Sequence, residues 1–235
     1  MNKLTSMFQN LTKGASRMVG GSMKSKRVHN AYEGGDYTTM MSLVSTMSQT
    51  QFIREIRQDD MPILHRAVME DKYDAVEALT QLPYFEELAN DDSYEDGWTP
   101  LLWSVNNSTR SDLKVFKLLV DHGAQLLKPK SSDGLTALHI AATTNDVHIV
   151  DFILENVDNP QRAVNTKNKE GWTPAHFSGF FNNFDSLNLL LENGADMSIK
   201  DNNNMSTFDE IVRNDHKDLF ECIFPYTKSY KRDLS

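Results

Sequence analysis

The chain has 235 residues, of which 39% are hydrophobic and 24% charged, and its formal net charge is −9. No run of about 18 apolar residues occurs, so we expect no transmembrane segment. The single cysteine, Cys222, excludes an intramolecular disulfide and indicates a reducing compartment. We therefore expect a cytoplasmic protein of one extended domain or two small ones, with cytoskeletal, ciliary, nuclear or organellar locations left open.

The first 28 residues form a basic arm. Residues 1–32 contain six bases and no acid, and the rest of the chain contains the other 18 bases and all 33 acids. The arm carries the bases Lys3, Lys13, Arg17, Lys24, Lys26 and Arg27. An apolar stripe at helical spacing precedes most of them, formed by Leu4, Met7, Phe8 and Leu11. The arm is a helix that anchors a partner, a disordered tail, or a membrane-surface or targeting helix.

Similar segments follow at regular intervals after residue 28. Thr99-Pro100-Leu101, Thr136-Ala137-Leu138-His139 and Thr173-Pro174-Ala175-His176 begin 37 residues apart, and Ser206 opens a weaker copy 33 residues after Thr173. An earlier copy reads Pro62-Ile63-Leu64-His65. Together with a first copy that lacks the motif, six repeats begin near residues 29, 58, 95, 132, 169 and 202.

Each copy has the features of two helices joined by a tight turn. A threonine can cap the first helix, and Pro100 and Pro174 suit its first turn because no N–H is needed there. Apolar residues at helical spacing give the second helix a buried stripe. Left-handed backbone is expected at the helix ends, from Gly123 and Gly194, and between the helices, from Asn145, Asn182 and Asp215.

These linked motifs resemble the ankyrin repeat over residues 29–225. The resemblance implies an all-α solenoid of stacked helix–turn–helix repeats with β-turn loop tips. The predicted organisation is a basic arm at 1–28, a repeat domain at 29–225 and a tail at 226–235. The sequence departs from the family where Leu102 replaces the histidine, where Val157 replaces a helix-ending glycine, and in longer loops at 82–96, 106–110 and 158–161.

No catalytic, cofactor or metal site is expected. The resemblance implies that His65, His139 and His176 hydrogen-bond to neighbouring loops, and they occur once per repeat without other ligands at zinc-binding spacing. The stretch Gly20–Ser25 is no phosphate-binding loop, because Met23 stands where a glycine must precede the lysine. Cys222 occupies an apolar position in the last helix, where a buried thiol is expected rather than a nucleophile.

The resemblance implies that partners meet the loop tips and the first helices. The tip residues are Trp98, Leu135 and Trp172, and the predicted contacts on the first helices are Arg66, Met69, Trp103, Ile140, Thr143, Phe177, Phe180 and Phe181. Aromatic residues are common where binding energy concentrates, but ordinary packing between repeats is the alternative. The acidic stretch 86–96 is a solvated loop or a dock for a basic segment.

The predicted function is a non-catalytic protein-interaction module, an adaptor or structural subunit of a larger protein complex. A dedicated inhibitor or assembly chaperone that binds reversibly and a regulatory subunit of an enzyme are the alternatives. An acidic body argues against nucleic acid as the partner, because phosphate repels it. No small-molecule substrate is expected.

Overall fold

The computed structural model describes residues 23–56, 61–94, 97–106, 113–130, 132–144, 146–220 and 223. The chain divides into two compact units, Met1–Arg66 and Ala67–Ser235. Within the described ranges the regular secondary structure is entirely helical, and β-pairing is limited to the isolated bridges Tyr94–Trp98 and Lys200–Ser206. No helix in these ranges has the length and apolar character to cross a membrane. The fold is the all-α arrangement that the sequence predicts.

The first unit contains α2 (Met23–Glu33), α3 (Tyr37–Ser45) and α4 (Gln49–Ile56). The Asp36 side chain caps α3 by accepting a hydrogen bond from the Thr39 N–H, and α2 and α3 pack together through buried Tyr32, Met40 and Val44. Because α2 begins at Met23, the predicted boundary at residue 28 falls inside a helix, on which Lys26 and Arg27 are exposed.

The other arm residues singled out above, Leu4, Met7, Phe8, Leu11, Lys13 and Arg17, lie outside the described residues, as does the Lys24 side chain. The roles predicted for them stay predictions.

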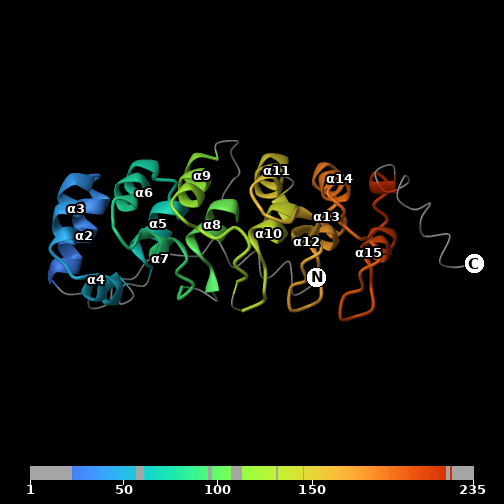
Figure 1. The fold of residues 1–235 in the computed structure, drawn as a ribbon, viewed down its shortest axis with the longest axis horizontal. Helices are drawn as coiled ribbons and strands as arrows, with labels where there is room; N and C mark the ends of the chain where they lie inside the picture. The colour runs from blue at the N-terminus through green and yellow to red at the C-terminus, as the bar shows by residue number, and fades with distance from the viewer. Residues whose placement is uncertain are drawn as a thin grey trace, which may run out of the picture. The chain divides into compact units, whose positions relative to one another are not determined.

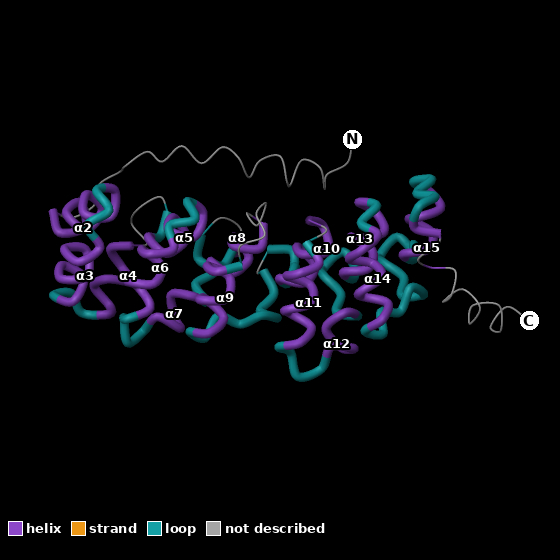
Figure 2. Tube along the Cα trace, turned by 90° about the horizontal axis from the view of Figure 1, so that it is seen from above, coloured by secondary structure: helices purple, strands orange, loops and turns teal. Residues whose placement is uncertain are grey.

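The second unit has two layers of helices (Figures 1 and 2). The inner layer contains α8 (Pro100–Asn106), α10 (Ala137–Thr144), α13 (Pro174–Phe181) and α15 (Thr207–Arg213). The outer layer contains α6 (Tyr73–Thr80), α9 (Lys114–Asp121), α11 (Val147–Glu155) and α14 (Phe184–Glu192). The inner helices begin one residue after Thr99, Thr136, Thr173 and Ser206, and α5 (Ile63–Met69) begins one residue after Pro62. In these five repeats the first helix thus begins where the sequence motif places it.

Left-handed residues end the helices where the sequence predicts them. Gly123 and Gly194 have φ of 96° and 85°, and Asn182 and Asp215 have φ of 58° and 54°. Asn145 lies outside the described residues. These residue types tolerate positive φ at little cost, so each short helix stops at a defined place and the chain turns back onto its neighbour.

The core of the second unit continues from one repeat to the next. Every residue of α10 from Ala137 to Ala142 is buried, and α11 buries its apolar stripe. One cluster joins the fifth repeat to the sixth, formed by Ala175, Leu187, Leu191, Met197, Ile211, Leu219 and Ile223. Each repeat thus covers its apolar surface with the next one, as expected of a solenoid.

Two of the long loops contain short helices, α7 (Phe85–Ala89) and α12 (Pro160–Val164). An asparagine follows each of them. The Asn90 Nδ2 donates to the Gly123 carbonyl at 2.8 Å, and the Asn165 Nδ2 donates to the Gly194 carbonyl at 2.9 Å. Each asparagine therefore ties its short helix to the turn that ends a later outer helix.

Candidate partner-binding surface

Buried histidines hold the loop tips of the second unit. The His139 Nδ1 accepts a hydrogen bond from the Thr136 N–H at 3.1 Å, so the ring proton lies on Nε2. The Nε2 is 3.1 Å from the Thr166 carbonyl and 3.2 Å from the Trp172 carbonyl, both in the chain leading to the next inner helix. Burial lowers the pKa of His139 to about 4. The neutral ring thus fixes the next loop, as the resemblance implied.

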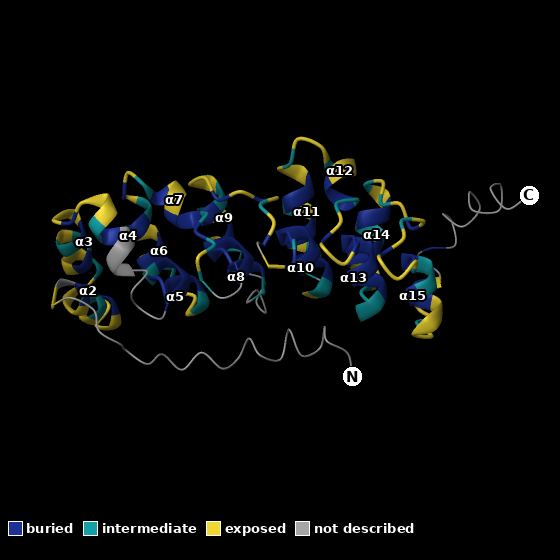
Figure 3. Ribbon diagram, turned by 90° about the horizontal axis from the view of Figure 1, so that it is seen from below, coloured by how far each residue is buried: buried dark blue, intermediate teal, exposed yellow. Residues whose placement is uncertain are grey.

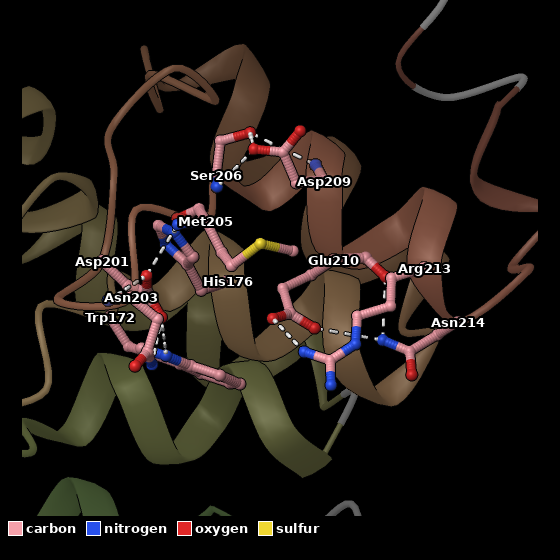
Figure 4. A network of polar contacts seen from close by, with 10 residues as sticks. All are labelled: Trp172, His176, Asp201, Asn203, Met205, Ser206, Asp209, Glu210, Arg213 and Asn214. Carbon is pink, nitrogen blue, oxygen red and sulfur yellow. Dashed lines mark hydrogen bonds and ion pairs between the residues drawn. The ribbon is translucent and has the colours of Figure 1, made fainter.

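The next tip repeats this arrangement (Figure 4). The His176 Nδ1 accepts from the Thr173 N–H at 3.1 Å, and its Nε2 donates to the Met205 carbonyl at 3.2 Å. The Trp172 indole Nε1 donates to Asp201 Oδ2 at 3.0 Å. Burial opposes ionisation of Asp201, but hydrogen bonds from Met205, Asn203 and Trp172 outweigh it and lower the pKa of the carboxyl.

The sixth repeat replaces the histidine with an acid. Asp209 accepts hydrogen bonds from the Ser206 N–H at 2.8 Å and from the Lys200 Nζ at 2.6 Å. The Lys200 contact is the main cause that lowers the pKa of Asp209 to about 2. The sixth repeat therefore uses a charged cap where the fourth and fifth repeats use the neutral rings of His139 and His176.

Six of the predicted contact residues are buried, all at most 7% exposed: Trp98, Trp103, Leu135, Ile140, Trp172 and Phe177. The prediction that they form an exposed face is wrong, because their side chains pack within the unit. The Trp98 and Trp103 ring centroids are 4.7 Å apart, and those of Trp172 and Phe177 are 5.0 Å apart. Alanine at these positions would remove packing rather than a contact with a partner.

Arg66 is also buried, within the first unit. Its Nη1 lies 2.9 Å from the His29 Nδ1 and 3.4 Å from the Glu33 Oε1, both on α2. The expected exposure of Arg66 is wrong too, because its guanidinium contacts α2 and only 7% of the residue is exposed.

Four predicted residues stay partly exposed in the second unit: Met69, Thr143, Phe180 and Phe181. Thr143 and Phe180 occupy the same position in successive inner helices, 37 residues apart, and Arg213 follows 33 residues later. Figure 3 shows that the ends of α10 and α13 are less buried than the rest of these helices. We call Thr143, Phe180, Phe181 and Arg213 the inner-helix ridge.

Phe180 is the central aromatic of the inner-helix ridge. Its ring centroid is 5.1 Å from that of Phe181 and 5.5 Å from that of buried Trp172. The Arg213 side chain is 65% exposed, and its Nη1 lies 3.8 Å from the Glu210 Oε1. Arg213 was missed by the sequence reasoning, although its 33-residue spacing from Phe180 identifies it.

The acidic stretch is less continuous in the structure than in the sequence. Glu86 and Glu87 are exposed on α7, whereas Asp91 is buried and accepts from the Ser93 N–H at 3.2 Å. Asp92 pairs with the Lys128 Nζ at 3.6 Å, and residues 95 and 96 lie outside the described residues. Among the described acids of the predicted dock, the fully exposed ones are thus Glu86 and Glu87.

The described ranges contain no group of three or more His, Cys, Asp or Glu side chains arranged to hold a metal ion. In a comparison with protein families, a model described as ankyrin repeats, in three copies, matches residues 112–201. The match begins just before α9 and ends at Asp201. It therefore covers the His139–Trp172 and Trp172–Asp201 contacts between loop tips.

Proposed function

We propose that this chain, whose residues 112–201 match a family model described as ankyrin repeats, is an adaptor or structural subunit of a larger protein complex. Ankyrin repeats generally mediate protein–protein interaction and are typically non-catalytic. The observation that carries the proposal is the hydrogen bonding of consecutive loop tips, such as Trp172 to Asp201. Tips held in this way lose little conformational entropy on binding, which favours affinity.

The inner-helix ridge is the proposed contact surface. It combines two partly exposed aromatic rings, Phe180 and Phe181, with the exposed guanidinium of Arg213. Aromatic residues and arginine are the types that most often supply binding energy at protein interfaces. The polar Thr143 extends the ridge by one repeat, and its hydroxyl already donates a hydrogen bond to the Ile140 carbonyl. We therefore expect the partner to insert apolar groups beside Phe180.

The test begins with identification of the partner by affinity purification and mass spectrometry. The dissociation constant is then measured for Phe180→Ala and for the matched control Phe184→Ala. Phe184 is 39% exposed at the start of α14, in the outer layer. We expect Phe180→Ala to weaken binding at least about fivefold, the effect of losing roughly 1 kcal/mol, and Phe184→Ala to change it less than about twofold.

Thermal unfolding followed by circular dichroism checks that both variants fold. Equal binding by the two folded variants would remove the ridge from the proposal. Size fractionation of cell extract tests the adaptor or subunit role itself. A chain found largely free would indicate a reversible inhibitor or chaperone, whereas co-migration with an enzyme whose activity depends on the chain would indicate a regulatory subunit.

A further inference from the structure

Two kinds of side-chain hydrogen bond recur along the second unit. A histidine of an inner helix holds the loop that leads to the next repeat, as His139 does with the Trp172 carbonyl at 3.2 Å. An asparagine in the loop before a repeat holds the turn that ends its outer helix, as Asn165 does with the Gly194 carbonyl at 2.9 Å. We call these the histidine tie and the asparagine tie. Because hydrogen bonds are directional, each tie fixes the orientation of consecutive segments.

Among the described residues, the connection between the third and fourth repeats has neither tie. We define this connection as residues 124–135 without 131. Leu102 stands 37 residues before His139, and its side chain has no N–H to donate to the connection. Lys128 stands 37 residues before Asn165, so an ammonium replaces the amide of the asparagine tie. Both substitutions thus affect one connection.

The turn that the missing asparagine tie would hold is altered as well. It follows α11, where Val157 stands 37 residues before Gly194. Gly194 has φ of 85°, whereas Val157 does not adopt positive φ. The fourth repeat therefore lacks both the amide of the asparagine tie and the left-handed turn that receives it in the fifth repeat.

The outer part of the connection is held by the loop before the third repeat. The Gln125 N–H donates to the Asn90 Oδ1 at 2.9 Å. The Lys128 Nζ donates to the Asn90 carbonyl and lies 3.6 Å from the Asp92 Oδ2. This part of the connection therefore belongs with the third repeat.

The tip of the connection is held by the fifth repeat. The Lys169 N–H donates to the Asp133 carbonyl at 2.8 Å, and the Lys169 Nζ donates to the Ser132 carbonyl at 3.0 Å. One contact back to the third repeat is the Lys130 Nζ, 4.8 Å from the Trp98 ring centroid. An ammonium is attracted anywhere over a ring face within about 6 Å, so this contact tolerates small shifts. The two parts of the connection are thus attached to opposite sides of the junction.

We propose that the junction between the third and fourth repeats is a hinge of the second unit. The inner-helix ridge lies on one side of it, on α10, α13 and α15. On that side His139 and His176 supply histidine ties, so the ridge keeps its shape while the third repeat moves. A ligand that contacts both sides then selects one degree of bending from those that the free chain adopts.

Distances between spin labels, measured by pulsed electron paramagnetic resonance in the full-length chain, test the hinge. Cys222→Ala removes the native thiol, and labels are attached to cysteines at Asp121, Glu155 and Glu192, the exposed last residues of α9, α11 and α14. The pair Asp121→Cys with Glu155→Cys spans the hinge. The pair Glu155→Cys with Glu192→Cys spans the next junction and is the matched control.

We expect the distance distribution of the hinge pair to be at least about twofold wider than that of the control pair, because segments with fewer fixed contacts fluctuate more. Equal widths, or a wider control pair, would overturn the proposal.

The variant His139→Leu tests whether missing ties cause the hinge. It removes the histidine tie at the control junction, as Leu102 does at the hinge. We expect the control distribution to widen at least about 1.5-fold and the hinge distribution to keep its width. Circular dichroism checks the helix content, and Asn165→Ala, which removes the asparagine tie, takes its place if His139→Leu does not fold. An unchanged control width in the folded variant would overturn the assignment of the hinge to these ties.

Discussion

At the scale of single residues, the buried His139 makes stability depend on pH. Its pKa is about 4 in the folded protein, below the 6.5 of an unperturbed histidine, so between these pH values the unfolded chain binds one more proton than the folded protein. The stabilisation is present above pH 6.5 and is lost as the pH falls toward 4. We expect the free energy of unfolding to drop by about 2 kcal/mol from pH 7 to pH 5, measured by urea denaturation. His176, whose pKa is also lowered by burial, adds to the loss.

The variant His139→Leu is the control for this prediction, because the third repeat carries Leu102 at the same position. It should be less stable at pH 7, since the Thr136 N–H and the Trp172 carbonyl lose their partner. It should also lose less stability on going to pH 5. If the variant keeps the wild-type pH dependence, His139 does not cause it.

Residues required for left-handed backbone could be predicted from the sequence, whereas the exposure of side chains could not. Gly123 and Asn182 were identified because few residue types tolerate positive φ, which is a local steric property. Trp172 was placed on a contact face, yet its ring packs on Phe177 and its indole reaches Asp201, 29 residues later. Such partners depend on how the next repeat docks, and the pattern of one repeat does not contain that information.

At the scale of elements, Asn165 couples α12 to the turn after α14. Its Nδ2 donates to the Gly194 carbonyl at 2.9 Å and its Oδ1 accepts from the Asp196 N–H at 2.8 Å. We expect Asn165→Ala to lower the free energy of unfolding by about 1–3 kcal/mol, because polar groups of the turn lose their partner. The matched control is Asn156→Ala, whose side chain donates to the Phe152 carbonyl within its own helix end. Urea unfolding in which both variants lose the same stability would rule out the coupling.

The two short helices differ in how far sequence could reveal them. The pair Asn159-Pro160 is a capping residue followed by proline at the first helical position, and the Asn159 side chain does accept from the Arg162 N–H at 2.9 Å. The longer loop predicted at 158–161 contains this pair, and the pair itself indicates a helix start. The start of α7 has no side-chain cap, and its buried Phe85 and Leu88 pack against the rest of the unit. Tertiary contacts determine α7, so local sequence does not predict it.

At the scale of the whole molecule, repeat boundaries were predicted wherever the threonine motif occurs. The start of the first helix was not predicted, because α2 carries no such motif. Since α2 begins at Met23, a deletion of the arm that spares this helix must end at residue 22. Val28 and Tyr32 of α2 are buried, so a truncation that removes part of this helix would expose the core of the first unit.

The basic arm is tested by deletion of residues 1–22, which spares α2. Both units should keep their helix content by circular dichroism, while recovery of the partner in a pull-down falls. The electrostatic part of the loss should shrink at high salt, because charges are screened within about 8 Å at physiological ionic strength and within less at higher salt. Recovery equal to that of the full-length chain would make residues 1–22 dispensable for assembly.

The ties between repeats also determine how the second unit responds to force. His139 reaches Trp172 and Asn90 reaches Gly123, so each tie spans about one repeat along the chain. A pull on the two ends of the second unit therefore loads these ties in series, and the weakest repeat yields while its neighbours stay folded. Each yielding repeat of 37 residues would release about 120 Å of chain, so we expect the second unit to lengthen in steps under load.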